Sequence, residues 1–325
     1  MRRREFFTAL GGAVAWPITV RAQQMPVIGV LYSGNSEAFR DDFSAFRDGL
    51  AETGLVEDHN VAFEFRMAES HLDRLPALAD DLVRRRVAVI FSGNNAAPTL
   101  AAKAATTTIP IVFFMGADPV DLGVVASLAH PGGNITGVTV LAGELFGKRV
   151  ELLHEIAPNA SKIAYLVNPT NRAFSESLLS EQTEAAHRLG LQLMILNASI
   201  PSDIDRAFTF VSEERLGAML VGPDTFFQAQ RDQIVTLATR YKIPVSYPRR
   251  DDVTAGGLIS YGSDFPDAYR RIGVYVGRIL RGENPKTLPV QQPTNFKLVV
   301  NLKAARQIGI EISTALITRA DEVIE

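Results

Sequence analysis

The chain of 325 residues contains no cysteine. This absence excludes disulfide bonds, thiol catalysis, thiolate metal sites and a lipid anchor on an N-terminal cysteine. Long apolar runs are absent as well. The stretch over residues 6–18 is interrupted by Gly11, Gly12 and Pro17, and it is shorter than the roughly 20 residues that a transmembrane helix needs. We therefore expect no insertion into a membrane.

Recognisable catalytic motifs are also lacking. The sequence "GELFGKR" (143–149) is one residue shorter than a phosphate loop, and Arg149 stands where Ser or Thr would bind magnesium. His154-Glu155 begins like a zinc-binding helix, but Pro158 occupies the position of the second histidine, and the other four histidines are scattered. We expect no cofactor, no metal site and no enzymatic activity.

Adjacent carboxylates are a further possible sign of catalysis. Neighbouring residues of a helix point about 100° apart, so we interpret these pairs as solvated helix faces and not as catalytic dyads. The pairs are Asp41-Asp42, Asp80-Asp81 and Asp251-Asp252.

The overall composition is that of a globular protein, with 46% hydrophobic and 21% charged residues and a net charge of −3. The chain is longer than the ~100–200 residues of one typical domain, so we expect two domains or two lobes. A mildly acidic chain without a basic tract is a poor ligand for nucleic acid, and we expect no such partner.

The first residues resemble an export signal. A basic start, a short apolar stretch and Val20-Arg21-Ala22 predict a signal peptide over residues 1–22, cleaved after Ala22. Arg3-Arg4-Glu5-Phe6-Phe7 matches the twin-arginine pattern, with a general secretory signal as the alternative. Either route predicts a periplasmic protein, and cleavage removes four arginines and one glutamate, which leaves a net charge of −6.

Short apolar, β-branched runs alternate with helical patterns along the rest of the chain, which is typical of parallel sheets with crossover helices. The predicted strands are 26–32, 60–66, 87–92, 110–115, 135–140, 162–168, 191–196, 216–221, 243–247 and 257–261. The predicted helices are 36–53, 71–86, 97–106, 143–156, 171–189, 202–214, 225–240 and 264–282.

Two series of about five strands predict two similar α/β lobes, each a parallel sheet flanked by helices. We place lobe 1 at 26–138 plus 264–286 and lobe 2 at 139–263 plus 287–325, with three chain crossings that form a hinge. The boundary near 138 follows Pro131, Gly132 and Gly133, which interrupt the pattern.

Small and polar residues follow several predicted strands. In parallel sheets ligands bind at the carboxyl ends of strands, where helix N-termini favour anions. In the first lobe these positions are Ser33, Asn94, Asn95, Ala96, Pro98 and Asp118. Pro98 suits the first position of a helix, and the loop from Asn94 could hold a carboxylate.

The second lobe repeats the pattern with Asn168, Asn171, Asp224, Tyr261 and Asp264. Asp118, Asp224 and Asp264 are candidates for pairing with a cationic group. Each polar residue has a second interpretation, since Asn, Asp and Ser also cap helix starts. The aromatic residues available for stacking are Phe39, Phe114, Phe174, Phe226, Phe227 and Tyr261, and we expect most of them to pack in the core.

Several of these stretches resemble one family. They are "MPVIGVLYSG" (25–34), the block from Ser92 to "PGGNITGV" (131–138), "NPTN" (168–171), "GPDTFF" (222–227) and the segment from "GGLISYGSDF" (256–265) to Ile310. Over essentially the whole chain after residue 22, the sequence resembles ABC-transporter substrate-binding proteins of the type I (LivK-like) periplasmic fold, a family with tryptophan- and tyrosine-binding members.

The resemblance implies a monomeric receptor that closes on a small molecule and delivers it to an ABC permease. It implies a carboxylate held by Asn94, Asn95, Ala96 and the helix from Pro98, and a second wall with Asn168, Asn171, Asp224 and Asp264. The family often has other residues at Asn94-Asn95 and at 222–225, so an aromatic amino acid cannot simply be carried over as the ligand.

Two other function classes remain open from the sequence. The same two lobes could report ligand occupancy to a membrane-bound signalling partner, in which case neighbouring genes would encode a histidine kinase and not a permease. Export of folded protein is also compatible with an enzyme, which turnover of a bound ligand would reveal.

Overall fold

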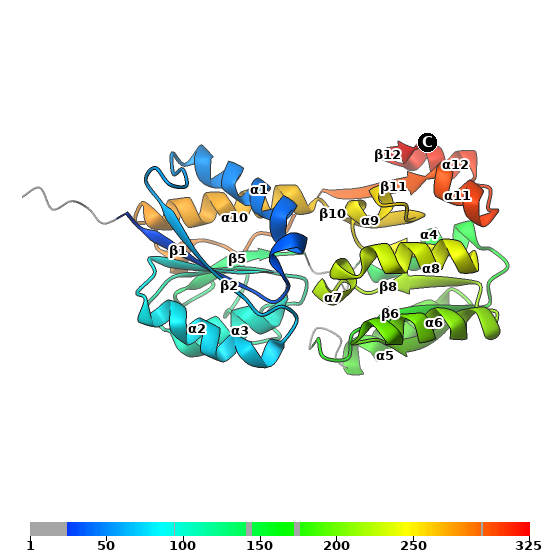
Figure 1. Ribbon diagram of the computed structural model, residues 1–325, viewed down its shortest axis with the longest axis horizontal. Coiled ribbons are helices and arrows are strands. Elements are labelled where there is room, and N and C mark those ends of the chain that lie inside the picture. Colours follow the sequence, from blue (N-terminus) through cyan, green and yellow to red (C-terminus); the bar gives the residue numbers. More distant parts are fainter. Residues whose placement is uncertain (1–24, 94, 141–144, 172–175, 294) are drawn as a thin grey trace, which may run out of the picture.

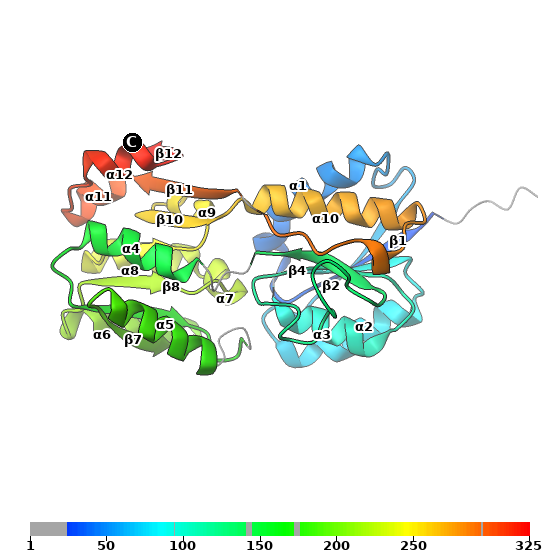
Figure 2. The same ribbon diagram turned by 180° about the vertical axis from the view of Figure 1, so that it is seen from behind.

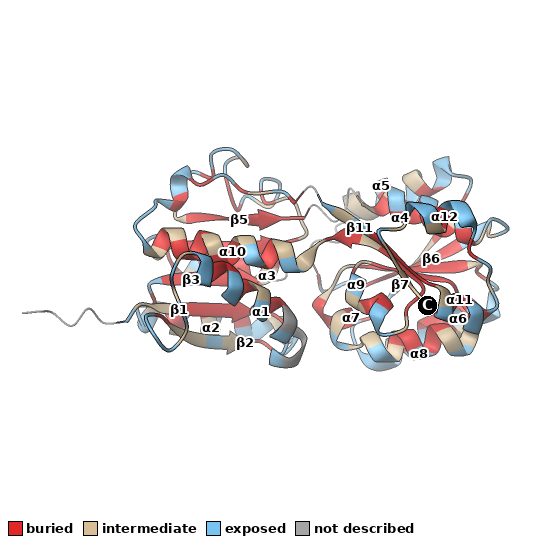
Figure 3. Ribbon diagram, turned by 90° about the horizontal axis from the view of Figure 1, so that it is seen from above, coloured by how far each residue is buried: buried red, intermediate tan, exposed pale blue. Residues whose placement is uncertain are grey.

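The computed structural model describes residues 25–93, 95–140, 145–171, 176–293 and 295–325. Each of the two sheets carries helices on both faces, and the resulting lobes lie side by side (Figure 1). Figure 3 shows that the strands of both sheets are largely buried, as strands covered on two faces should be. The predicted signal peptide lies outside the described residues.

The lobe 1 sheet has five parallel strands in the order β2-β1-β3-β4-β5. They are β1 (Val27–Tyr32), β2 (Ala62–Met67), β3 (Val89–Gly93), β4 (Ile111–Met115) and β5 (Ile135–Thr139). The helices are α1 (Ser36–Glu52), η1 (Leu72–Arg74), α2 (Leu75–Arg84), α3 (Ala96–Ala105), α10 (Phe265–Leu280) and η2 (Pro285–Thr287). One core cluster unites the sheet with α1 and α10, and another unites it with α2 and α3.

Helix α10 joins lobe 1 although the chain reaches it only after ten strands have been formed (Figure 2). Its packing against α1 is close because glycines lie at the contact. A Cβ on Gly273 would lie 2.0 Å from the backbone oxygen of Phe46, and one on Gly49 would lie 1.8 Å from that of Arg270. A larger residue at either position would force the two helices apart.

The lobe 2 sheet has seven strands in the order β12-β11-β10-β9-β8-β6-β7. They are β6 (Lys162–Val167), β7 (Gln192–Asn197), β8 (Ala218–Val221), β9 (Val245–Tyr247), β10 (Ile259–Ser263), β11 (Phe296–Asn301) and β12 (Glu322–Ile324). All ten predicted strands are present, while β11 and β12 were not predicted, and β11 runs antiparallel to β10.

Helices α4 and α5 pack against one face of this sheet, and α6, α7 and α8 pack against the other. A further cluster joins α4, β10 and β11 to α11 and α12. The helices are α4 (Phe146–Ile156), α5 (Glu176–Arg188), α6 (Pro201–Glu213), α7 (Thr225–Ala229), α8 (Arg231–Tyr241), α9 (Arg250–Thr254), α11 (Leu302–Ile308) and α12 (Thr314–Arg319). The single helix predicted over 225–240 is divided, because Gln230 leaves the helical conformation between α7 and α8.

The chain passes between the lobes three times, after β5, after β10 and before β11. After η2 it still follows lobe 1, because Gln291 exchanges backbone hydrogen bonds with Gly137 and Thr139. The domain limits stay a prediction. These contacts favour ending the second segment of lobe 1 after Gln291 in place of residue 286.

Candidate functional site

One cavity of about 810 Å³ is walled by both lobes. It lies at the carboxyl ends of β4, β8, β9 and β10 and at the start of α3, where a parallel sheet is expected to bind its ligand. Of the predicted contacts, six line this cavity: Asn95, Ala96, Asp118, Asn171, Asp224 and Tyr261. Ser33, Pro98, Asn168 and Asp264 do not line it, and Asn94 lies outside the described residues.

The start of α3 is fixed by Asn95. Its side-chain oxygen accepts a hydrogen bond from the Ala97 amide (2.9 Å), and its Nδ2 donates to the Ser33 hydroxyl (3.1 Å). Ser33 in turn donates to Thr225 on α7 of the opposite lobe (3.4 Å). The prediction that Pro98 opens the helix is wrong, because the Asn95 cap starts it at Ala96 and leaves Pro98 at the third position.

Asp118 has the role of a cap. One of its carboxylate oxygens accepts hydrogen bonds from the amides of Val120 (2.7 Å) and Asp121 (3.4 Å). The residues that follow Asp118 form turns and not a helix. Asp118 therefore lines the cavity while one of its oxygens stabilises its own loop.

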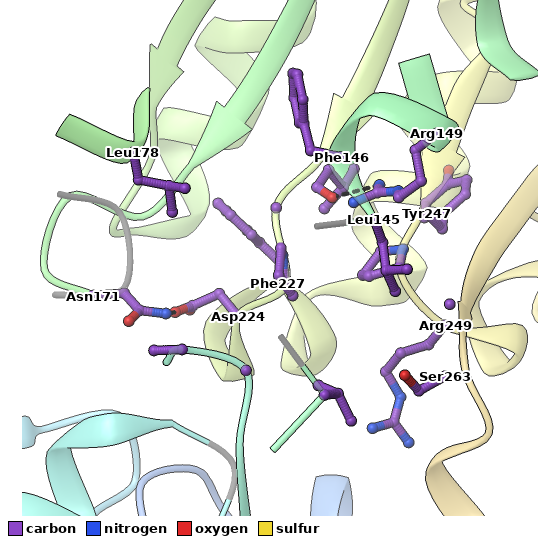
Figure 4. Close-up of a pocket in the computed structure, with 18 of the residues that line it drawn as sticks. Leu145, Phe146, Arg149, Asn171, Leu178, Asp224, Phe227, Tyr247, Arg249 and Ser263 are labelled. Atoms are coloured by element: carbon purple, nitrogen blue, oxygen red, sulfur yellow. Dashed lines mark hydrogen bonds between the residues drawn. The ribbon is translucent and has the colours of Figure 1, made fainter. Parts of the chain in front are cut away.

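Asp224, which is partly buried, is the centre of a polar cluster in lobe 2 with the buried Asn168 and Asn171. Its carboxylate accepts hydrogen bonds from Nδ2 of Asn168 (3.0 Å), Nδ2 of Asn171 (2.7 Å) and the Phe226 amide (2.9 Å). Burial raises the pKa of this carboxyl, although the three hydrogen bonds oppose the shift. The cluster joins the loops after β6 and β8 into one wall of the cavity, as Figure 4 shows for Asn171 and Asp224.

Tyr261 in β10 and Asp264 just after it differ in position, because Tyr261 lines the cavity and Asp264 does not. Tyr261 lines the cavity and packs against Phe296, with ring centroids 6.0 Å apart. Asp264 caps α10 by accepting a hydrogen bond from the Asp267 amide (3.1 Å). Asp264 therefore acts as a helix cap, which was the second interpretation of this residue.

A buried ion pair connects the two lobes. Arg249, which follows β9, donates to both carboxylate oxygens of Asp42 on α1 (2.8 and 3.4 Å) and also contacts Asp251 (2.9 Å). The Arg249 and Asp42 side chains are 7% and 2% exposed. The Arg249 guanidinium also lies 4.0 Å above the centre of the Phe265 ring.

The prediction that the paired carboxylates are solvated helix faces is therefore wrong for Asp42 and Asp252. Both are buried. Burial raises the pKa of Asp252 to about 6, with Arg249 as the main opposing influence. A helix face can be buried against a second lobe, which spacing within one helix does not reveal.

Arg149 on α4 is buried inside lobe 2 at the edge of the cavity, and only 3% of it is exposed. Its Nη2 donates to the backbone oxygens of Val221 and Ser246, at 2.7 Å each. Burial lowers its pKa to about 10, and burial also raises the pKa of the neighbouring Tyr165 hydroxyl to about 12. Figure 4 shows Arg149 beside Leu145, Phe146 and Tyr247.

A profile of the ABC transporter substrate binding protein family matches residues 28–324. The chain belongs to this family. Members of the family bind substrates and are not enzymes. Within the described residues, no group of three His, Cys, Asp or Glu side chains is placed to hold a metal ion, and no helix there combines the length and apolar composition of a membrane span.

Named relatives support the same assignment. A tyrosine-binding protein of Clostridioides difficile (strain R20291) is 23% identical over 266 residues, which is 82% of this chain and 76% of the relative. The crystal structure of a conserved domain protein from Vibrio cholerae O1 biovar eltor has a TM-score of 0.85 and 28% identity, covering 92% of this chain and 100% of that one.

A third similar structure is an ABC domain from Streptococcus pneumonia in complex with L-Trp, with a TM-score of 0.82, 24% identity and coverage of 92% and 99%. These structures share the two-lobed α/β fold of type I periplasmic binding proteins. The predicted fold class and family are thereby confirmed.

Two buried charged residues of this substrate-binding protein, Arg149 and Asp42, were not identified as site residues from the sequence. Arg149 lies on the buried stripe of α4 with Phe146, Val150 and Leu153. Asp42 lies on the α1 stripe between Phe39 and Phe46, both of which are buried. A single charge within an apolar i, i+3, i+4, i+7 pattern is the signal that would have identified both.

Proposed function

We propose that this protein is a receptor of an ABC importer that binds a small carboxylate-bearing solute between its lobes and delivers it to the permease. The observation that carries the proposal is the cavity of about 810 Å³ whose walls come from both lobes. A ligand that contacts both walls favours the closed arrangement over the open one, and a permease can recognise that difference.

The size and walls of the cavity agree with a small amphipathic molecule. About 810 Å³ lies within the range of small-molecule sites, and Phe114, Phe146 and Phe227 supply apolar surface. Burying ~200 Å² of an aromatic ligand gives about 5 kcal/mol, while micromolar binding needs about 8 kcal/mol, so polar contacts must supply the difference. The L-Trp and tyrosine named for two relatives belong to this size class.

Within this proposal the cavity-lining residues are the ligand contacts, and the other predicted residues support them. Asn95, Ala96, Asp118, Asn171, Asp224 and Tyr261 are the proposed contacts. Ser33, Pro98, Asn168 and Asp264 would hold the walls in place, and Asn94 stays a sequence-based prediction. We further propose a monomer exported to the periplasm after cleavage behind Ala22.

A thermal-shift screen of the purified protein tests the function. The panel contains aromatic and branched-chain amino acids, aromatic carboxylates, short acids and sugars. A ligand at 100 times its dissociation constant adds about 2.7 kcal/mol, which raises the melting temperature by a few degrees. A carboxylic acid that produces this shift without being converted supports the proposal. A response to sugars alone, or to nothing in the panel, contradicts the carboxylate class.

A further inference from the structure

Hydrogen-bonding capacity that is buried and unused gathers on one wall of the cavity. Six cavity-lining residues each hold a buried polar atom without a hydrogen-bond partner: Arg149 Nε, Gln182 Oε1, Arg231 Nε, Tyr247 OH, Arg249 Nε and Ser263 Oγ. All six residues belong to lobe 2. None of the described cavity residues of lobe 1 has such an atom. Buried polar atoms are nearly always hydrogen-bonded in folded proteins, so we expect a bound ligand to supply partners for the atoms of this wall.

The chemistry of these atoms specifies the complementary group. The three arginine Nε atoms can only donate, the hydroxyls of Tyr247 and Ser263 can donate, and only Gln182 Oε1 is restricted to accepting. A wall composed mainly of donors fits a ligand rich in acceptors. An anionic group offers the largest number of acceptor sites on few atoms.

Arg149 stands out among the donors because it is not part of an ion pair, and the buried carboxyl of Asp252 acts on it only from beyond ion-pair distance. Arg249 is paired with Asp42 and Asp251, and Arg231 lies 3.6 Å from Asp232. No described carboxylate lies within ion-pair distance of Arg149, whose Nη2 is bonded to two neutral backbone oxygens. A buried cation without a counterion is unfavourable, and a bound anion would supply the missing charge.

The surroundings of Arg149 specify the body of the ligand. Figure 4 shows Leu145 and Phe146 beside Arg149 and Tyr247, with Phe227 between this group and Asp224 and with Asn171 further across the cavity. Phe227 and Phe146 are themselves buried. A charged head beside apolar side chains suits an acid with an aromatic or aliphatic body.

We propose that Arg149 anchors the acidic group of the solute in lobe 2, in place of the start of α3 in lobe 1. The inference rests on the proposed function, since it assigns the end of the cavity at which the carboxylate binds. It makes lobe 2 the lobe that selects an acid over its neutral analogues.

Isothermal titration with matched ligands tests the anchor. The probes are L-tryptophan, indole-3-propionate and L-tryptophanamide, and the proteins are the wild type and R149Q. We expect the wild type to prefer both acids to the amide by at least tenfold, and R149Q to lose most of that preference. The matched control is R206Q, which removes the same charge from a side chain of α6 that is 71% exposed and does not line the cavity. It should keep the preference.

The outcomes separate the two proposals. If the wild type binds the acids and R149Q keeps the same acid-to-amide ratio, the anchor is wrong while the receptor function stands. If the wild type binds none of the probes, the aromatic-acid class and its anchor both fail. Circular dichroism spectra establish that each variant is folded.

Because Arg149 also bonds two strand ends, R149Q could unfold. A crystal structure of the wild type with L-tryptophan then decides without any variant. A carboxylate within hydrogen-bond distance of the Arg149 guanidinium supports the anchor, and a carboxylate at the start of α3 overturns it.

Discussion

The two walls of the cavity are built from different kinds of residue. The lobe 1 wall contains Asn95, Ala96, the loop from Gly116 to Asp118 and the rings of Phe114 and Phe265, and none of its described side chains has a buried polar atom without a partner. The lobe 2 wall contains long polar and aromatic side chains, several with atoms that have no partner. If Arg149 is the anchor that we propose, lobe 2 recognises the solute and lobe 1 covers it.

The hydrogen-bonded cluster around Asn95 in lobe 1 is smaller than the cluster around Asp224 in lobe 2. In lobe 1, Asn95 holds one helix start and one hydroxyl. In lobe 2, Asp224 holds two loops and the start of α7 through three hydrogen bonds. The Asp224 cluster of lobe 2 thus contains more hydrogen bonds than the Asn95 cluster of lobe 1. Disrupting it should lower the free energy of unfolding by a larger amount.

The largest effect is expected for D224A. The change removes the carboxylate that accepts from two buried amides and caps α7, and we expect a loss of about 4 kcal/mol from the free energy of unfolding. Urea denaturation measures it. D232A is the control, since it removes an exposed carboxylate from α8. Equal stability of the two variants would show that the Asp224 cluster does not hold the lobe 2 wall.

The next effect concerns the contact between the walls. D42N removes the charge that Arg249 faces across the lobes, and breaking a buried pair typically costs 3–5 kcal/mol, so we expect a loss of about 3 kcal/mol with Asp251 still in place. D48N removes an exposed carboxylate from the same helix as a control. Small-angle scattering should show a larger radius of gyration for D42N without ligand. An unchanged radius would mean that the pair does not hold the lobes together.

The smallest effect is expected in the lobe 1 wall. N95A removes a helix cap, which costs about 1 kcal/mol, together with the bond to Ser33. N95S keeps a capping oxygen and should recover part of the loss. Thermal unfolding measures both variants. A loss for N95A as large as that for D224A would refute the contrast between the walls.

Strands β1 to β10 and the edge at which the cavity lies were predicted from the sequence, because they follow from apolar runs and from the polar residues that end them. Asn95 and Asp224 were identified for the same reason. The roles of Asp42 and Arg149 depend on contacts with segments distant in the chain, such as Arg249 and Ser246. No local pattern encodes those partners, and the antiparallel pairing of β11 is likewise a long-range property.

The packing of α10 against α1 determines when lobe 1 can be completed during synthesis. Its core includes Tyr269, Ile272 and Val276, which leave the ribosome only after most of lobe 2 has been translated. Domains of many proteins fold in the order of their synthesis. Until α10 is made, only α1 covers this face of the lobe 1 sheet. The lobe that is translated first is therefore completed only after most of lobe 2 has been synthesised.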